Sequence, residues 1–280
     1  MSNNNAPETE PAVLFEATAS GVGIVTLNRP DRLNSWGPDM APPFYAAVDC
    51  AENDPAIRVI VLTGRGRAFC AGAHLGSSGA GADVGDSLDK AGGKSVADLV
   101  GDRPPHFLTE LRKPVIAAIN GACVGIGLTQ ALMCDVRFAA AGAKFAAVFA
   151  RRGLIAEFGI SWILPRLTGW GVALDVLLSG RTFLADEAAR LGIVKEVVAP
   201  ENLMNRVMEY AEDIAQNCSP AALSVIKRQA YRDAGHDVVA ATAEAEALMW
   251  QGLPRPDVVE GIVSFLQKRP PQFPSLDSAP

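Results

Sequence analysis

Hydrophobic residues in the first two-thirds of the chain fall into short blocks that predict strands and helices in alternation. Two unbroken apolar runs, 59–63 and 114–119, are typical of parallel strands buried on both faces. Shorter apolar runs predict further strands over 13–17, 23–27, 135–140 and 193–198. Apolar residues at helical spacing predict helices over 42–53, 128–133, 162–167, 172–178 and 185–191.

The segments that join these elements carry most of the glycine-rich sequence. Residues 64–72 and 120–127 are expected to be turns. Residues 76–93 are rich in Gly, Ser, Ala and Asp without periodicity, which predicts a long loop. A helix is expected over 96–111, with a break at Pro104-Pro105.

The last third of the chain has a mostly helical pattern. Ser219 before Pro220 is the usual start of a helix, and that helix should run to Tyr231. Two further helices are expected over 238–251 and 257–266. Alternating strands and helices followed by helices alone predict an α/β fold with a helical C-terminal region. The predicted parts are a disordered tail (1–11), an α/β core (12–200) and the helical region (201–280).

Composition excludes several classes of function. The 280 residues are 49% hydrophobic and carry a net charge of −6, with no long Lys/Arg block, so nucleic acid and anionic membranes are not expected partners. Five irregularly spaced cysteines and three histidines favour neither a disulfide framework nor a metal site. The N-terminus lacks the features of a signal peptide, and the expected location is the cytoplasm. The apolar stretch 115–134 approaches the length of a membrane span, but Asn120 and several glycines interrupt it.

Two segments share one layout, in which a buried strand is followed by a glycine turn and a helix start. The first runs from Val59 to His74 and the second from Val115 to Gly127. Unpaired N–H groups at a helix start carry the positive end of the helix dipole. Two such groups that converge on one point would stabilise a negative oxygen. The alternative is that these glycines only permit close packing of helix on strand.

With these motifs the sequence resembles the crotonase family, the enoyl-CoA hydratases and isomerases. The resemblance runs from about Ile24 to Phe273. It rests on the following segments: Leu27-Asn28-Arg29-Pro30 with Leu33-Asn34, Ala68-Phe69-Cys70-Ala71-Gly72-Ala73, Asn120-Gly121-Ala122-Cys123-Val124-Gly125, Cys134-Asp135, Leu164-Pro165-Arg166-Leu167 and 185–194.

The resemblance implies a crotonase-like spiral of ββα turns that assembles as a homotrimer or a hexamer through region 201–280. It also implies an acyl-CoA substrate, so that coenzyme A arrives as part of the substrate and no separate cofactor or metal is expected. Matching positions place the two oxyanion N–H groups on Ala73 and Ile126. Most relatives have glycine at the position of Ile126, but a backbone donor does not depend on its side chain.

The acids depart from the family pattern. Relatives that hydrate enoyl-CoA hold a water between two glutamates, and the matching positions here are Thr129 and Phe149. Neither residue can act as an acid or a base. Glu157 matches the position of the acid that carries a proton in isomerases of the family. Apolar neighbours are expected to raise the pKa of its carboxyl group. The alternative is a solvated glutamate beside a turn.

The resemblance also gives a set of residues expected to contact the substrate. Arg32 and Leu33 are expected near the pantetheine and phosphates of coenzyme A, and Phe265 and Lys268 would reach coenzyme A on the same or a neighbouring subunit. Lys268 also suits a helix C-terminus, which is the structural alternative. The remaining expected contacts are Ala71, His74, Gly125, Thr129 and Phe149.

The sequence leaves three interpretations of function open. The favoured one is an enoyl-CoA isomerase that uses Glu157, and the runner-up is an enoyl-CoA hydratase. A non-catalytic acyl-CoA-binding protein is the third, because both hydratase acids are missing. A thioester hydrolase would need a positioned nucleophile or a His–acid pair, and the sequence offers neither.

Overall fold

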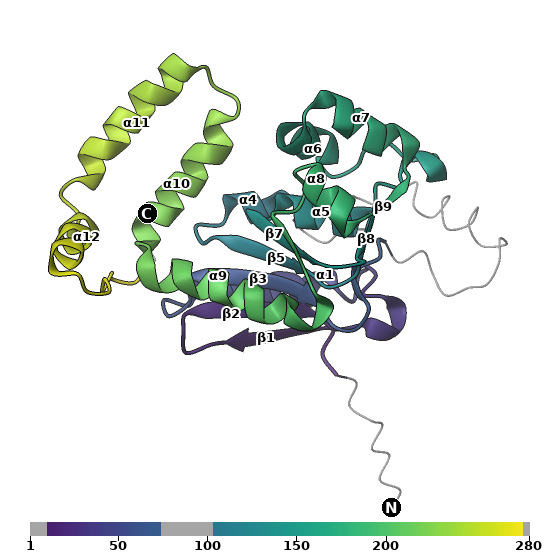
Figure 1. The fold of residues 1–280 in the computed structure, drawn as a ribbon, viewed down its shortest axis with the longest axis horizontal. Helices are drawn as coiled ribbons and strands as arrows, with labels where there is room; N and C mark the ends of the chain where they lie inside the picture. Colours follow the sequence, from purple (N-terminus) through teal and green to yellow (C-terminus); the bar gives the residue numbers. More distant parts are fainter. Residues whose placement is uncertain (1–9, 74–102, 277–280) are drawn as a thin grey trace, which may run out of the picture.

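A six-stranded sheet forms the centre of the molecule. The computed structural model describes residues 10–73 and 103–276. Its main sheet has the order β1-β2-β3-β5-β7-β10 (Figure 1). The strands are β1 (Val13–Ala17), β2 (Val22–Leu27), β3 (Val59–Gly64), β5 (Val115–Ile119), β7 (Val136–Ala140) and β10 (Glu196–Val198). The β1–β2 pair is antiparallel, and every other neighbouring pair is parallel.

A second, smaller sheet contains four strands in the order β4-β6-β8-β9. Its strands are β4 (Ala68–Cys70), β6 (Ala122–Val124), β8 (Lys144–Ala146) and β9 (Thr182–Leu184). The successive pairs β3–β4, β5–β6 and β7–β8 each give their first strand to the main sheet and their second to the small sheet, as expected for a spiral of ββα turns. The predicted turns 64–72 and 120–127 were therefore wrong in part, since each contains a strand. Three-residue strands are too short to show alternation in a sequence.

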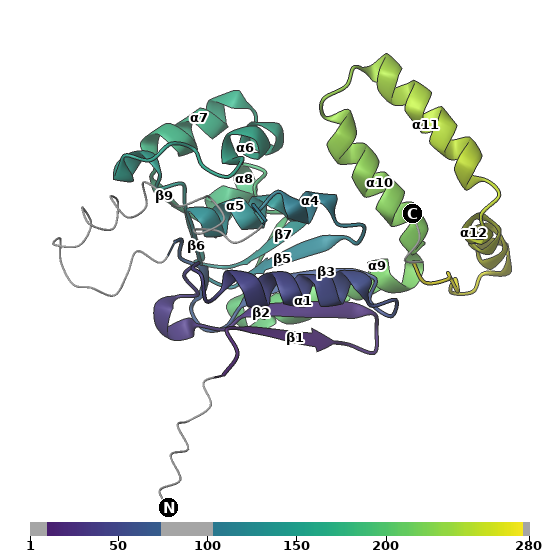
Figure 2. The same ribbon diagram turned by 180° about the vertical axis from the view of Figure 1, so that it is seen from behind.

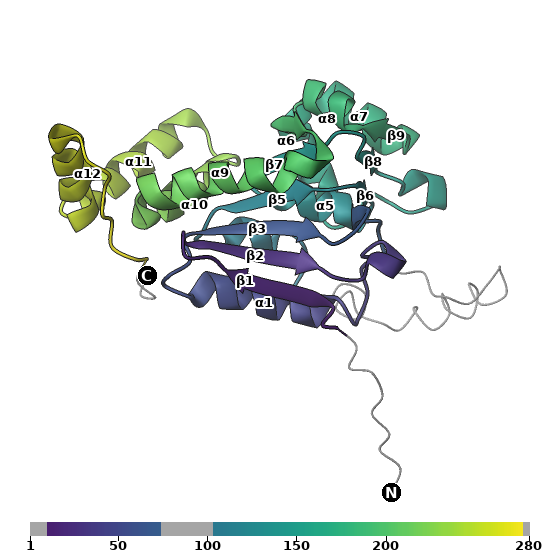
Figure 3. The same cartoon turned by 60° about the horizontal axis from the view of Figure 1, so that its bottom comes forward.

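Helices cover both faces of the main sheet. Figure 3 shows α1 (Ala41–Asn53) on one face and α9 (Leu203–Asn217) on the other. Successive residues of β3 alternate between these layers: Ile60 packs in the cluster with α1, and Val61 packs in the cluster with α9. Every residue of β3 is buried, so the expectation of a strand covered on both faces is confirmed.

The remaining helices of the core follow the predicted ones within a few residues. They are α5 (Ile126–Met133), α6 (Ile160–Thr168), α7 (Trp170–Ser179) and α8 (Ala185–Arg190), with short 3-10 turns at Pro30–Arg32, Ala150–Arg152 and Pro200–Asn202. Of the helix expected over 96–111, the described part contains only α4 (Phe107–Glu110). The expected loop 76–93 and His74 lie outside the described residues. No helix in the described ranges is long and apolar enough to cross a membrane.

The C-terminal helices α10 (Pro220–Asp233), α11 (Val238–Gly252) and α12 (Pro256–Gln267) form an arm that stands beside the core (Figures 1 and 2). The Ser219 hydroxyl accepts from the Ala222 N–H at 3.1 Å, which confirms the predicted N-cap. The predicted helical region 201–280 contains α9 as well as the three helices of the arm. Helix α9 packs on the sheet with a stripe of apolar residues, so the arm begins at α10.

The first described residues are held by polar contacts. The predicted tail 1–11 lies mostly outside these ranges, but Glu10 and Pro11 are described. The Asn28 amide donates to the Glu10 carboxylate at 3.2 Å and to the Pro11 carbonyl at 2.9 Å. Glu10 and Pro11 are therefore tied to Asn28, directly after β2.

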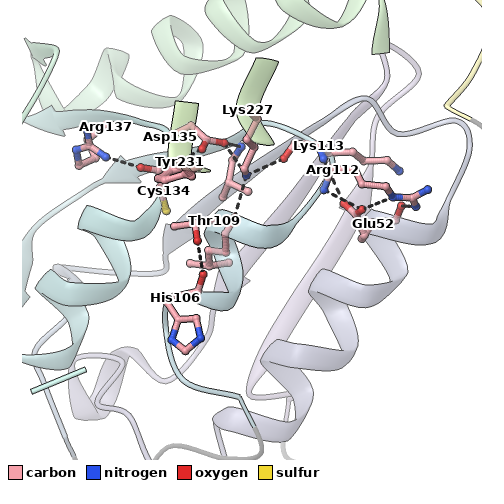
Figure 4. Close-up of polar contacts among 12 residues, drawn as sticks. Glu52, His106, Thr109, Arg112, Lys113, Cys134, Asp135, Arg137, Lys227 and Tyr231 are labelled. Atoms are coloured by element: carbon pink, nitrogen blue, oxygen red, sulfur yellow. Dashed lines mark hydrogen bonds and ion pairs between the residues drawn. The ribbon is translucent and has the colours of Figure 1, made fainter. Parts of the chain in front are cut away.

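A buried ion pair fixes the arm to the core (Figure 4). Lys227 of α10 lies 2.8 Å from the Asp135 carboxylate and also donates to the carbonyls of Leu108 and Lys113, at 2.8 and 3.1 Å. The Tyr231 hydroxyl donates to Asp135 at 3.0 Å. Every hydrogen of the ammonium group thus has an acceptor, which offsets the cost of burying its charge.

Replacing Lys227 with methionine should destabilise the protein strongly, because the partly buried Asp135 carboxylate would lose its cation. We expect a loss of about 3 kcal/mol in the free energy of unfolding, measured by urea denaturation. The control is Arg65→Met, which breaks the exposed pair with Glu10 and should change the midpoint little. Equal effects of the two changes would contradict this account of the anchor.

Candidate active site

Two turns lie side by side because their strands are paired in register. Cys70 of β4 and Cys123 of β6 are partners in a parallel ladder. Ala73 and Ile126 each follow three residues after these partners. A Cβ built on Gly125 would lie 3.8 Å from the Gly72 Cα, so the backbones of the two turns are in contact. The sheet register therefore brings the N–H groups of Ala73 and Ile126 onto adjacent turns.

The first peptide is oriented by Trp36. The Trp36 N–H donates to the Gly72 carbonyl at 2.8 Å, and Trp36 and Ala73 form an isolated parallel bridge. In a planar trans peptide the N–H points opposite to the carbonyl. The N–H of Ala73 therefore points away from the Trp36 backbone, and it donates to no group within the described ranges.

The second peptide is oriented by the first turn of α5. The Gly125 carbonyl accepts from the Thr129 N–H at 3.0 Å and from the Thr129 hydroxyl at 3.3 Å. The Ile126 N–H of the same peptide then points outward from the helix start, where the helix dipole is positive. Gly125 has φ 56° and ψ −123°, a conformation that residues with a Cβ avoid.

Gly127 allows α5 to lie directly against β4. A Cβ at this position would fall 2.3 Å from the Cys70 carbonyl oxygen, which is a severe clash with backbone. Two side-chain amides hold the first residue of the same strand: Asn34 and Asn120 both donate to the Ala68 carbonyl, at 2.8 and 3.2 Å. Both asparagines were recognised only as parts of motifs, because sequence does not show that their side chains meet at one carbonyl.

Glu157 lies in the loop before α6, and its side chain is half-buried. Burial raises the pKa of its carboxyl group, in the direction expected from the sequence. The carboxylate has no ion pair or hydrogen bond among the described residues. Next to it, Phe158 and Gly159 both have positive φ, and a Cβ on Gly159 would lie 3.2 Å from the Met133 side chain at the end of α5. The loop is therefore held against α5.

The two positions that carry glutamates in hydratases are both buried and apolar in their surroundings. Thr129 is fully buried, and its hydroxyl donates a hydrogen bond to the Gly125 carbonyl. Phe149 is buried in the core cluster that also contains Ile126. Cys70 does not supply a nucleophile either, since burial raises the pKa of its thiol to about 11.

The predicted substrate contacts divide into two groups. Ala71 donates its N–H to the Leu33 carbonyl at 3.1 Å, so Leu33 lies beside the first turn, and Arg32 is held next to it by Asp39. In contrast, Phe265 and Lys268 lie at the end of α12 and are exposed, at the far end of the arm from α5 (Figures 1 and 2). Within one chain, Phe265 and Lys268 therefore do not lie beside the other predicted substrate contacts.

Comparison with known proteins decides the family. The model of the enoyl-CoA hydratase/isomerase family matches residues 17–275. The chain belongs to this family. It is 35% identical to the 1,2-epoxyphenylacetyl-CoA isomerase of Escherichia coli, over 90% of this chain and 95% of that protein. It is 32% identical to the short-chain-enoyl-CoA hydratase of Clostridium acetobutylicum, over 89% of this chain and 92% of that protein.

Solved structures of family members give the same fold. An enoyl-CoA hydratase of Bacillus anthracis matches with a TM-score of 0.83 and 28% identity, over 94% of this chain and 99% of that chain. An enoyl-CoA hydratase of Mycobacterium marinum is 69% identical, with a TM-score of 0.67 over 79% of this chain and 98% of that chain. The protein is therefore an acyl-CoA-processing enzyme of the crotonase fold.

Replacing Gly125 with alanine tests whether the peptide before Ile126 matters for activity. The new Cβ meets nothing closer than 3.8 Å, so the change acts through φ rather than through a clash. We expect kcat/KM to fall by a factor of about 100, as for loss of one oxyanion donor. Gly142→Ala is the control, since Gly142 also has positive φ and open space but lies in a distant turn. Full activity of the Gly125 variant would contradict the role of this peptide.

Proposed function

We propose that the protein catalyses the shift of a double bond in an enoyl-CoA. The N–H groups of Ala73 and Ile126 hold the thioester oxygen, and the Glu157 carboxylate carries the proton. The observation that supports this proposal best is the half-buried Glu157, the one carboxyl group of raised pKa among the described residues, in a chain with no acid at either hydratase position. Such a site offers one proton carrier and no pair of acids to hold water.

The reaction needs no group beyond these. The Glu157 carboxylate removes a proton from the α-carbon of a 3-enoyl-CoA, and the electron pair moves into the thioester to form an enolate. Two N–H donors stabilise the enolate oxygen. The protonated Glu157 then returns the proton to the γ-carbon, which leaves the conjugated 2-enoyl-CoA and the original carboxylate. Atoms and charge balance without added water.

The raised pKa of Glu157 suits both halves of this cycle. A carboxylate with a higher pKa is a stronger base, and its protonated form persists long enough to return the proton. The alternative, hydration of a 2-enoyl-CoA, is the activity named for several relatives. It requires a base and an acid at the positions of Thr129 and Phe149, and these side chains cannot titrate there.

The test compares Glu157→Gln with the wild type on two substrates. Glutamine keeps the shape of the side chain and removes the base, so isomerisation of 3-hexenoyl-CoA should fall by a factor of about 1000. The assay follows the ultraviolet absorbance of the conjugated thioester. Hydration of 2-hexenoyl-CoA at a high rate that survives this change would overturn the proposal. Tight binding of both compounds without turnover would instead favour the non-catalytic interpretation.

The pH profile of the wild type gives a second readout of the same group. The base acts only when ionised, and burial raises its pKa. Activity should therefore decline on acidification through a pH above the usual glutamate range and recover fully on return. Glu187, whose pKa is lowered by Arg181, is the matched control. Glu187→Gln should leave the decline of activity on acidification unchanged.

We also propose that the active protein is a homotrimer or a hexamer. Helix α11 has no buried residue, and α12 buries only Ser264. Large apolar side chains on the arm stay exposed in a single chain, including Met249, Trp250, Phe265 and Leu266. A second exposed apolar surface lies on α7, around Trp170 and Leu178. Surfaces of this kind are typical of subunit contacts, and an assembly could carry Phe265 and Lys268 to coenzyme A on a neighbour.

Trp250→Asp should weaken the assembly, because it places a charge on the exposed apolar face of α11. Light scattering after size exclusion should then give a mass that falls toward the 29.4 kDa of one chain. Phe15→Asp places the same charge on an exposed apolar position of β1 and should leave the mass unchanged. A wild type of 29.4 kDa at micromolar concentration would contradict the proposed assembly.

A further inference from the structure

Thr129 is a buried polar side chain in the first turn of α5, next to the peptide that carries the Ile126 N–H. Its hydroxyl donates to the Gly125 carbonyl at 3.3 Å, which is the one hydrogen bond that this hydroxyl makes within the described part of the chain. Thr129 is 0% exposed, and its single hydroxyl proton already has an acceptor. Thr129 therefore reaches the site through Gly125 and not by direct contact with a substrate.

The Gly125 carbonyl and the Ile126 N–H are the two ends of one planar peptide. The carbonyl accepts two hydrogen bonds from Thr129, from its N–H at 3.0 Å and from its hydroxyl at 3.3 Å. A hydrogen bond to a carbonyl oxygen draws electron density from the amide nitrogen by resonance, so the N–H at the other end becomes a stronger donor. The hydroxyl therefore strengthens the donor that is proposed to hold the thioester oxygen.

A threonine hydroxyl in a helix often donates to the carbonyl four residues earlier, simply to find an acceptor. Thr168, the last residue of α6, makes this bond to the Leu164 carbonyl at 2.9 Å. The Leu164 carbonyl belongs to the peptide of Pro165, which has no N–H to strengthen. The bond of Thr129 differs because its acceptor, Gly125, shares a peptide with an N–H at a helix start. Thr168 is therefore a matched control for Thr129.

We propose that Thr129 is a positioning residue for the reaction, whose hydroxyl strengthens the Ile126 N–H as an oxyanion donor through the Gly125 carbonyl. This inference rests on the proposed function for the role of the Ile126 N–H and does not depend on Glu157. The enolate oxygen carries more negative charge than the thioester oxygen of the substrate. A stronger donor should therefore raise kcat more than it improves substrate binding.

Thr129→Val removes the hydroxyl and keeps the branched shape of the side chain. The Gly125 carbonyl keeps its bond from the N–H of residue 129, so no buried polar group is left unpaired and the fold should be retained. One oxyanion donor contributes a factor of about 100 to 1000 to kcat, and a neighbouring hydrogen bond strengthens the next by about 10–30%. Loss of the hydroxyl should therefore lower kcat by a factor of about two to eight.

The kinetic test measures kcat and KM for 3-hexenoyl-CoA, together with the melting temperature of each variant. Thr129→Val should lower kcat by the factor given above, with little change in KM or in melting temperature. Thr129→Ser keeps the hydroxyl and should keep the kcat of the wild type. Thr168→Val removes the matched hydroxyl of α6 and should also leave kcat unchanged. An unchanged kcat in Thr129→Val, or a loss that serine does not restore, would overturn the inference.

Infrared spectra of bound hexanoyl-CoA, carbon-13 labelled at the thioester carbon, give a readout without turnover. Hydrogen bonds from the site lower the carbonyl stretching frequency, so the band should lie higher in Thr129→Val than in the wild type, in Thr129→Ser or in Thr168→Val.

The two measurements separate this inference from the proposed function. A band that Thr129→Val does not move would overturn the inference and leave the proposed isomerase untouched. A band that moves in a protein without isomerase activity would support the inference and overturn the role of Glu157. A wild-type band no lower than that of free hexanoyl-CoA would overturn both the oxyanion donors and the inference.

Discussion

The register between β4 and β6 is the constraint on which the site depends. Because Cys70 and Cys123 are partners in a parallel ladder, equivalent positions of two turns meet, and the N–H groups of Ala73 and Ile126 fall on adjacent backbones. Gly127 allows α5 to pack against β4. Asn34 and Asn120 hold β4 in place by donating to the carbonyl of its first residue, Ala68. A change in this register would separate the two peptides, whatever their side chains.

In the proposed mechanism, backbone donors and side-chain acids contribute separately to the chemistry. The donors require a conformation rather than particular side chains, so isoleucine at position 126 is compatible with the same peptide orientation. The acids decide what happens to an enolate. Here the buried threonine at position 129 is bonded to the Gly125 carbonyl, and Glu157 is left as the candidate proton carrier.

Sequence predicted the long elements well and the short ones poorly. The run 59–63 identified a strand buried on both faces, and Ser219-Pro220 identified a helix start, since each signal is local. Strands β4, β6 and β8 span three residues each, which is too few for a pattern. The ion pair of Lys227 with Asp135 depends on a contact between distant segments. The site residues came from motif resemblance, and the peptide orientations could come only from the fold.

The central claim is that a single carboxylate moves a proton within the substrate and that no water is added. The most direct measurement follows 3-hexenoyl-CoA deuterated at the α-carbon, by NMR and mass spectrometry in water enriched in oxygen-18. The account predicts 2-hexenoyl-CoA with part of the deuterium at the γ-carbon and no oxygen-18 in the early product. Rapid formation of 3-hydroxyhexanoyl-CoA that carries oxygen-18, with no deuterium at the γ-carbon, would contradict it.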